Sequence, residues 1–278
     1  MSNGRFSNLE MGGGGPAAGQ GGGVTAVSAS PVTPGNRANP FATELKDAAF
    51  HLRSAIRHEL AGNFEEALRD YAVALGENPL LPEAWSGQLW VLLELGEYPE
   101  ARLWADKALE RFPESPDLLA AKSVALYRMG LAEDARALND AALQKKGESA
   151  LVWLCRGEIM LTSSRAAGEE CLARALRIAS PDDATLVRAA GVAMRLHSFS
   201  LAMSFLQQAV TRHPDAARAW YLQGRMQESL GQFAVAEISF RQAAGLAPDN
   251  RAYRQLLPYQ RPGVVARFRA WLRQVTGS

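Results

Sequence analysis

Two series of small residues recur along this chain at a nearly constant interval. The first series is Ala67, Ala101, Ala135, Gly168, Ala202 and Ala236. The second is Ala74, Ala108, Ala142, Ala175, Ala209 and Ala243. Both advance by 34 residues at each step, except for one step of 33. A period of this length indicates a chain of stacked structural repeats. It therefore predicts one elongated array, where a length of 278 residues alone would also allow two compact domains.

Other positions recur in the same phase, and the stretch 217–250 carries the fullest set. In addition to Ala236 and Ala243, it has a large residue at position 4, small residues at 8 and 15, an aromatic residue at 24 and proline at 32. These are Trp220, Gly224, Gly231, Phe240 and Pro248. The pattern resembles the tetratricopeptide repeat, a unit of two helices. It divides the chain into six units, 48–81, 82–115, 116–149, 150–182, 183–216 and 217–250.

This resemblance implies an all-α fold, a right-handed solenoid of six helix-turn-helix tetratricopeptide repeats with a C-terminal capping helix. The residue types fit that fold physically. Small residues at the two series let helix backbones approach closely, and a larger side chain there would overpack. Glycine near position 15 permits the left-handed conformation that ends the first helix. Proline at position 32 ends the second helix, because proline cannot continue the hydrogen-bond ladder.

Residues 1–40 form a different kind of segment, with ten glycines and a proline-rich end. Such a composition buries too little apolar surface to offset the loss of chain entropy, so a disordered arm is predicted. Phe6 and Leu9 lie ahead of the glycines and could form a short docking motif on this arm. The alternative is a plain disordered start.

Residues 251–278 are strongly basic, with six arginines and no acidic residue, whereas residues 41–250 carry a net charge of −6. A last helix is predicted over about 264–275, with Arg267, Arg269 and Arg273 on its polar face. One interpretation is a cap, since terminal repeats need a polar outer face. The others are contact with an anionic protein or, less favoured, a membrane surface, and head-to-tail self-association with the acidic array.

The sequence offers no convincing catalytic, cofactor or metal site. The histidines are scattered, and no cysteine or nearby acid completes a metal set around His51 and His58. The glycines of 14–19 resemble part of a phosphate loop, but Gln20 stands where lysine is required. We therefore predict a non-enzyme without cofactors. Nucleic acid is not expected as a partner, because six arginines at one short end are few and the array is acidic.

The predicted partner-binding residues lie on the first helix of each unit, where the resemblance places the concave face. The candidates are Leu52, Ile56, Trp90, Val124, Tyr127, Arg188, Arg195, Tyr221 and Arg225. The front half of this groove is apolar and the rear half is rich in arginine, which predicts a peptide or amphipathic helix with apolar anchors and acidic residues. The family's lysine–asparagine carboxylate clamp is absent. The alternative is that Trp90 and Tyr127 belong to the core between repeats.

These observations favour a protein–protein interaction scaffold or adaptor. The competing class is an accessory or regulatory subunit of an enzyme or of a membrane-associated assembly complex, acting through the basic helix or the arm. A cytoplasmic location is expected, because no secretory signal or apolar run of membrane-spanning length is visible. Cys155 and Cys171, the only cysteines, are accordingly expected to be reduced.

Overall fold

The computed structural model describes residues 47–257, apart from 148, 161–162 and 179–182. The described residues form thirteen α-helices and no strand. The helices are α1 Ala48–Ala61, α2 Phe64–Glu77, α3 Pro82–Leu95, α4 Tyr98–Arg111, α5 Pro116–Arg128, α6 Ala132–Leu143, α7 Ala150–Met160, α8 Arg165–Arg177, α9 Asp183–Arg195, α10 Phe199–Arg212, α11 Ala217–Ser229, α12 Phe233–Leu246 and α13 Arg251–Arg254. None of them is long and apolar enough to cross a membrane.

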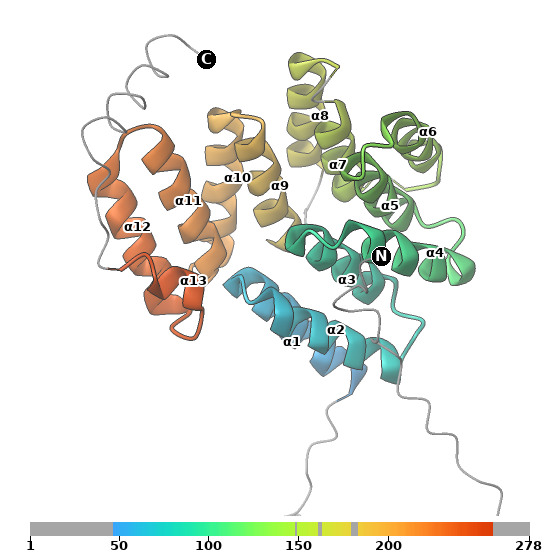
Figure 1. The fold of residues 1–278 in the computed structure, drawn as a ribbon, viewed down its shortest axis with the longest axis horizontal. Helices are drawn as coiled ribbons and strands as arrows, with labels where there is room; N and C mark the ends of the chain where they lie inside the picture. The colour runs from blue at the N-terminus through green and yellow to red at the C-terminus, as the bar shows by residue number, and fades with distance from the viewer. Residues whose placement is uncertain (1–46, 148, 161–162, 179–182, 258–278) are drawn as a thin grey trace, which may run out of the picture.

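The helices form six consecutive pairs, α1–α2 to α11–α12, which follow one another around an arc (Figure 1). The predicted all-helical repeat fold is confirmed. Each first helix begins at the first residue of a 34- or 33-residue unit, so the sequence period and the helix-pair period coincide. The arm 1–40, with Phe6 and Leu9, and the segment 258–278, with Arg267, Arg269 and Arg273, lie outside the described residues.

The turns between paired helices explain the recurring glycine. Gly62, Gly96, Gly130 and Gly231 lie just after first helices and have positive φ angles between 74° and 88°. His197 occupies the corresponding turn of the fifth unit with φ 55°. Because a side chain in this left-handed region costs energy, glycine occupies four of the five turns that the structure describes in full, which excludes the turn of the fourth unit.

The two small-residue series lie at the closest helix contacts. Their alanines are all at most 1% exposed, and Gly168 is also buried. They lie on the second helices, and eight of the eleven alanines belong to a continuous apolar cluster that extends from Ala55 in α1 to Met226 in α11. The period of the sequence is therefore the period of backbone-to-backbone packing.

Glycines inside two first helices make room for an aromatic ring from a neighbouring second helix. Gly87 in α3 lies against the ring of Tyr71 in α2, and Gly224 in α11 lies against Phe240 in α12. A Cβ atom added to Gly224 would approach the Phe240 ring to 2.6 Å. These positions therefore require the absence of a side chain for packing, whatever the backbone conformation.

The two ends of the array meet, so the arc closes on itself. Helix α1 contacts α9 and α11 as well as its neighbours α2 and α3 (Figure 1). The Asn250 side chain, at the start of α13, donates hydrogen bonds to the Gly62 carbonyl at 3.1 Å and to Asn63 Oδ1 at 2.9 Å. The Tyr253 ring lies against Gly62 and stacks on Tyr221 at 4.9 Å. The last unit thus packs directly against the first.

We expect Gly224→Ala to destabilise the protein by about 1–3 kcal/mol, because the added methyl group overpacks against Phe240. The matched control is Gly245→Ala in α12, where an added Cβ has no atom within 4 Å. That change should be neutral or stabilise by up to about 1 kcal/mol, because alanine favours the helix. Urea unfolding followed by circular dichroism measures both changes, and equal effects would contradict the packing argument.

Candidate functional site

The first helices α1, α3, α5, α7, α9 and α11 contact one another at the inside of the closed arc. They carry all nine predicted partner-binding residues, but with very different exposure. Trp90, Val124 and Arg188 are buried, whereas Leu52, Ile56, Tyr127 and Tyr221 are half-buried. The side chains of Arg195 and Arg225 keep 40% and 49% exposure. Only part of the predicted groove is therefore accessible in this conformation.

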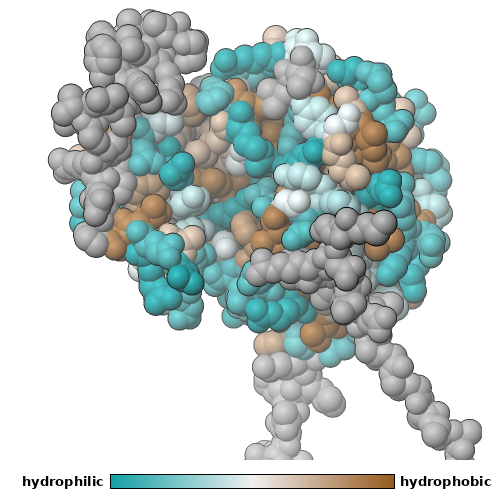
Figure 2. All heavy atoms as spheres, in the orientation of Figure 1, coloured by the Kyte–Doolittle hydropathy of each residue, from teal (hydrophilic) through white to brown (hydrophobic). Residues whose placement is uncertain are grey.

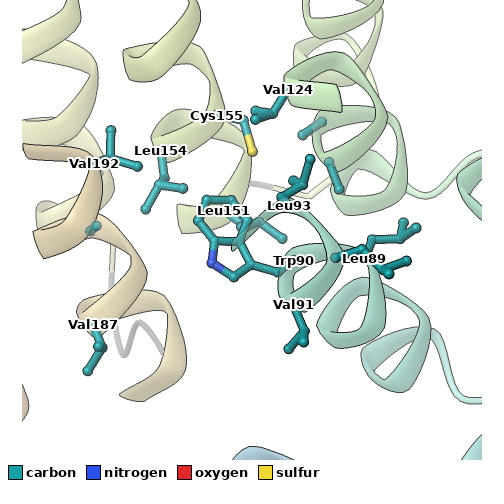
Figure 3. Close-up of a cluster of buried hydrophobic side chains, with 14 of the residues drawn as sticks. Leu89, Trp90, Val91, Leu93, Val124, Leu151, Leu154, Cys155, Val187 and Val192 are labelled. Atoms are coloured by element: carbon teal, nitrogen blue, oxygen red, sulfur yellow. The ribbon is translucent and has the colours of Figure 1, made fainter. Parts of the chain in front are cut away.

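Trp90 lies in the apolar interior of the array. Its ring lies beside Leu151 and Leu154 of α7, and its indole edge is directed from α3 toward α9 (Figure 3). Tyr127 packs with Leu126 and Ile159 in a small separate cluster. These positions favour the alternative in which both aromatic residues belong to the core between repeats. In the space-filling view, hydrophilic and hydrophobic side chains are interspersed over the centre of the face, with no single apolar patch there (Figure 2).

A buried ion pair joins the first unit to the fifth. Arg188 in α9 donates from Nε to Glu59 Oε1 and from Nη2 to Glu59 Oε2, each at 2.7 Å. The two side chains are only 6% and 1% exposed. Tyr71 donates a further hydrogen bond to Glu59 Oε2 at 3.0 Å, and the Arg188 guanidinium lies 5.4 Å from the Trp90 ring. Two-pronged pairing of this kind holds both partners in a fixed geometry.

A second pair joins the second unit to the sixth. Arg218 in α11 donates from Nη2 to Glu94 Oε2 at 2.6 Å, and its guanidinium also lies 4.7 Å from the Phe64 ring. Arg195 Nη1 lies 3.7 Å from Glu94 Oε1. Burial alone would raise the pKa of Glu94, but the charges of Arg218, Arg195, Arg128 and Arg188 together outweigh burial and leave that pKa below its ordinary value.

A third acid, Glu158 in α7, connects the middle of the array. Arg128 in α5 donates to it from Nε at 2.8 Å and from Nη2 at 3.1 Å, and Arg195 donates from Nη2 at 3.2 Å. Arg128 Nη1 also donates to the Leu93 carbonyl at 2.7 Å. Through Arg195, which approaches both Glu94 and Glu158, the second and third ion-pair groups form one network across the inner face.

The acidic half of this network was not predicted from the sequence. Glu94 and Glu158 stand near the ends of first helices among apolar neighbours, as in the stretch from Trp90 to Leu95, whereas Glu59 follows Arg57 and His58. A single acid within such an apolar run is unusual, because charged groups are rarely buried without a partner. That signal could have marked Glu94 and Glu158 as buried ion-pair sites, although it could not have identified their arginines.

One acid lies close to His51 and His58, although their spacing along the chain does not indicate it. Asp70 of α2 lies within hydrogen-bond distance of His58, with 2.9 Å between Asp70 Oδ2 and His58 Nδ1. Its other carboxylate oxygen lies 3.9 Å from His51 Nδ1. Helix pairing brings these residues together, and spacing along the chain does not reveal it. Among the residues that the structure covers, no three potential ligands are grouped so that they could hold a metal ion.

The two cysteines are free thiols, as expected from the sequence. Cys155 is buried in the apolar interior, and burial raises the pKa of its thiol well above the ordinary value. Such a thiol is protonated and unreactive at neutral pH. Cys155 therefore adds no reactive group to the inner face, where the described interactions are ion pairs between guanidinium groups and carboxylates.

Comparison with known proteins agrees with the repeated helix pairs. A family model described as tetratricopeptide repeat matches residues 52–116 and 187–251. No curated protein sequence gives a significant match.

Similar solved structures include TTC0263, a thermophilic tetratricopeptide repeat protein of Thermus thermophilus. It is 23% identical with a TM-score of 0.48, over 65% of this chain and 97% of that one. Another is a tetratricopeptide repeat protein from Parabacteroides merdae, 16% identical with a TM-score of 0.47, over 78% and 85% of the two chains. At TM-scores below 0.5, these resemblances carry no information about a ligand.

Removing one partner of the Glu59–Arg188 pair should be far more harmful than removing both. We expect Arg188→Met to lower the free energy of unfolding by about 3–5 kcal/mol, because the charge of Glu59 stays buried without its guanidinium. The double variant Glu59→Met/Arg188→Met should recover most of that loss, because both charges are gone. Urea unfolding measures each variant, and a double variant as unstable as the single one would contradict this explanation.

The lowered pKa of Glu94 predicts a dependence of stability on pH. The Glu94 carboxyl binds a proton less readily in the folded protein than in the unfolded chain. Its contribution to the free energy of unfolding is therefore complete above the unfolded pKa, near 4.5, and is lost as pH falls through the lower folded pKa. Glu94→Gln should therefore make the decline of stability below pH 4.5 less steep. The control is Glu114→Gln, whose side chain is 77% exposed. Equal slopes for both variants in pH-dependent urea unfolding would refute the assignment.

Proposed function

The chain belongs to the tetratricopeptide repeat family, and from that premise we propose that it is a non-catalytic scaffold that binds a segment of another protein at the inner face of its repeats. Proteins of this family are generally repeat scaffolds that bind proteins or peptides. The observation that carries the proposal for this chain is the cationic lining of α9 and α11, where Arg188, Arg195, Arg218 and Arg225 follow one another.

The solvent-exposed arginines of this lining are the residues that a partner would contact first. Arg195 and Arg225 are partly open to solvent, while the apolar residues Trp90, Val124 and Val187 are covered. Exposed arginines attract acidic segments over a distance and pair with carboxylates in a two-pronged geometry. The proposed partner is therefore an acidic peptide or helix, with Tyr221 as a half-buried apolar contact beside the arginines.

The proposed setting is the cytoplasm, which the two free cysteines support, since a reducing compartment keeps thiols unpaired. The role as an adaptor or assembly factor is part of the same proposal. The alternative role, an accessory subunit that acts through its ends, would use Phe6, Leu9, Arg267, Arg269 and Arg273 instead.

Affinity co-purification from the native cell tests the site. We expect Arg225→Glu to weaken capture of the main partner by roughly tenfold, since a reversed charge at the rim repels an acidic segment. The matched control is Arg69→Glu on α2. Arg69 is also exposed and also pairs with a glutamate three residues away, as Arg225 does.

Two shortened baits, residues 41–278 and 1–250, separate the alternatives. A partner retained by both but weakened by Arg225→Glu supports binding at the inner face. A partner lost with either end would assign binding to the arm or the basic helix. Equal capture by Arg225→Glu and Arg69→Glu would refute the inner face as the site.

A further inference from the structure

In the ion pairs that join the two ends of the array, the acidic residues come from the front end and the arginines come from the rear end. The acids Glu59 and Glu94 come from α1 and α3, in the first two units. The guanidinium groups that bind them come from α9 and α11, in the last two units: Arg188, Arg195 and Arg218. The rear of the inner face is thus a set of arginines, and the front supplies carboxylates to it.

The glutamates of the front units bind the arginines of α9 and α11 as the carboxylates of an acidic ligand would. Glu59 lies on Arg188 in the two-pronged geometry with which arginine recognises any carboxylate. Glu94 is hydrogen-bonded to Arg218 and lies near Arg195. Because these contacts depend on the carboxylate group alone, a glutamate or aspartate from another chain could replace either one.

The closed arrangement leaves polar atoms unsatisfied at this same place. Glu94 Oε1, Arg218 Nη1 and Trp90 Nε1 are buried without a hydrogen-bond partner among the described residues. Buried donors and acceptors are normally paired, and a partly satisfied network is a costly one. The pair between Glu94 and Arg218 is therefore a weak point of the closure, where a ligand that also reached the free donors would bind better than Glu94 does.

Two guanidinium groups of the site lie over a glycine, and one of them is open to solvent. A Cβ atom placed on Gly191 of α9 would lie 3.8 Å from both Arg195 Nη1 and Arg218 Nη2, so the two guanidinium groups lie over a residue that has no side chain. Arg195 is 40% exposed, and it connects this site to solvent. An acidic segment can therefore meet Arg195 first, before Glu94 leaves Arg218.

We propose that Arg188, Arg195 and Arg218 form the binding site for a carboxylate-rich segment of the partner, and that Glu59 and Glu94 occupy this site in the free protein as an internal substitute for it. Binding then requires the front units to separate from the rear ones. This inference rests on the proposed function and adds to it the residues that accept the acids and the contact that must break.

The first experiment weakens one of the internal acids. The probe is a fluorescein-labelled octaglutamate peptide, followed by fluorescence anisotropy, with octalysine as the control for charge. Glu94→Gln, which leaves the buried Glu59–Arg188 pair intact, should bind octaglutamate roughly tenfold more tightly than the unmodified protein, because a larger fraction of molecules is open. The matched control, Glu114→Gln, changes the net charge equally but affects an exposed acid, and should bind as the unmodified protein does.

The second experiment prevents opening without changing any residue of the site. Glu65 and Arg251 are exposed. Glu65 lies two residues after Asn63 and Arg251 directly follows Asn250, and the side chains of these two asparagines meet across the closure. Cysteines at these two positions, in a Cys171→Ser background, can be joined by a flexible bis-maleimide, while buried Cys155 stays unreactive. The joined protein should bind octaglutamate at least roughly tenfold more weakly than the same protein before joining.

The outcomes separate this inference from the proposed function. Tighter binding after the first change and weaker binding after joining support displacement of Glu59 and Glu94. Equal octaglutamate binding before and after joining, or none in any form, overturns it. If the natural partner is captured equally by the joined and unjoined proteins, the scaffold function stands and the displacement is wrong.

Discussion

The close approach of helix backbones at the small-residue positions determines the rest of this structure. Every alanine in the two series is buried, and most of them lie in one continuous apolar cluster, so each pair packs tightly against the next. Tight stacking turns the chain within six units until α1 meets α9 and α11. Larger residues at these positions would separate the helices and open the arc. The buried ion pairs across the inner face depend on this spacing.

Closure of the array reduces the part of the inner face that a ligand can reach. In an open array this face is available to a ligand, whereas here Trp90 and Val124 lie in the core and Arg188 is bound to Glu59. Charged residues inside a protein are costly unless they are paired and hydrogen-bonded. The network satisfies most of that requirement, with Arg128 and Arg195 sharing Glu158. Where it does not, at Glu94 and Arg218, the structure leaves polar atoms that a partner could satisfy.

The repeated helix pairs could be predicted from sequence because each depends on local signals. The period is written in residues such as Ala67 and Ala101, and the turns in glycines such as Gly62 and Gly96. The closure could not be predicted in that way. Glu59 and Arg188 are 129 residues apart, and whether they meet depends on the small rotation between units, added over the whole array. For the same reason, the exposure of Trp90 could not be inferred from its position within one unit.

The contact of Asn250 with Gly62 and Asn63 has a consequence for how this chain holds together. In an open stack of repeats, each unit touches only its neighbours, so its stability is close to a sum of local terms and its ends fray independently. Here the sixth unit is also a neighbour of the first, and fraying of either end removes contacts from both. Neither end of such an array can therefore unfold at the low cost of a terminal repeat in an open stack. The protein should unfold as a single cooperative unit, like a compact globular domain, although its sequence is that of a linear array.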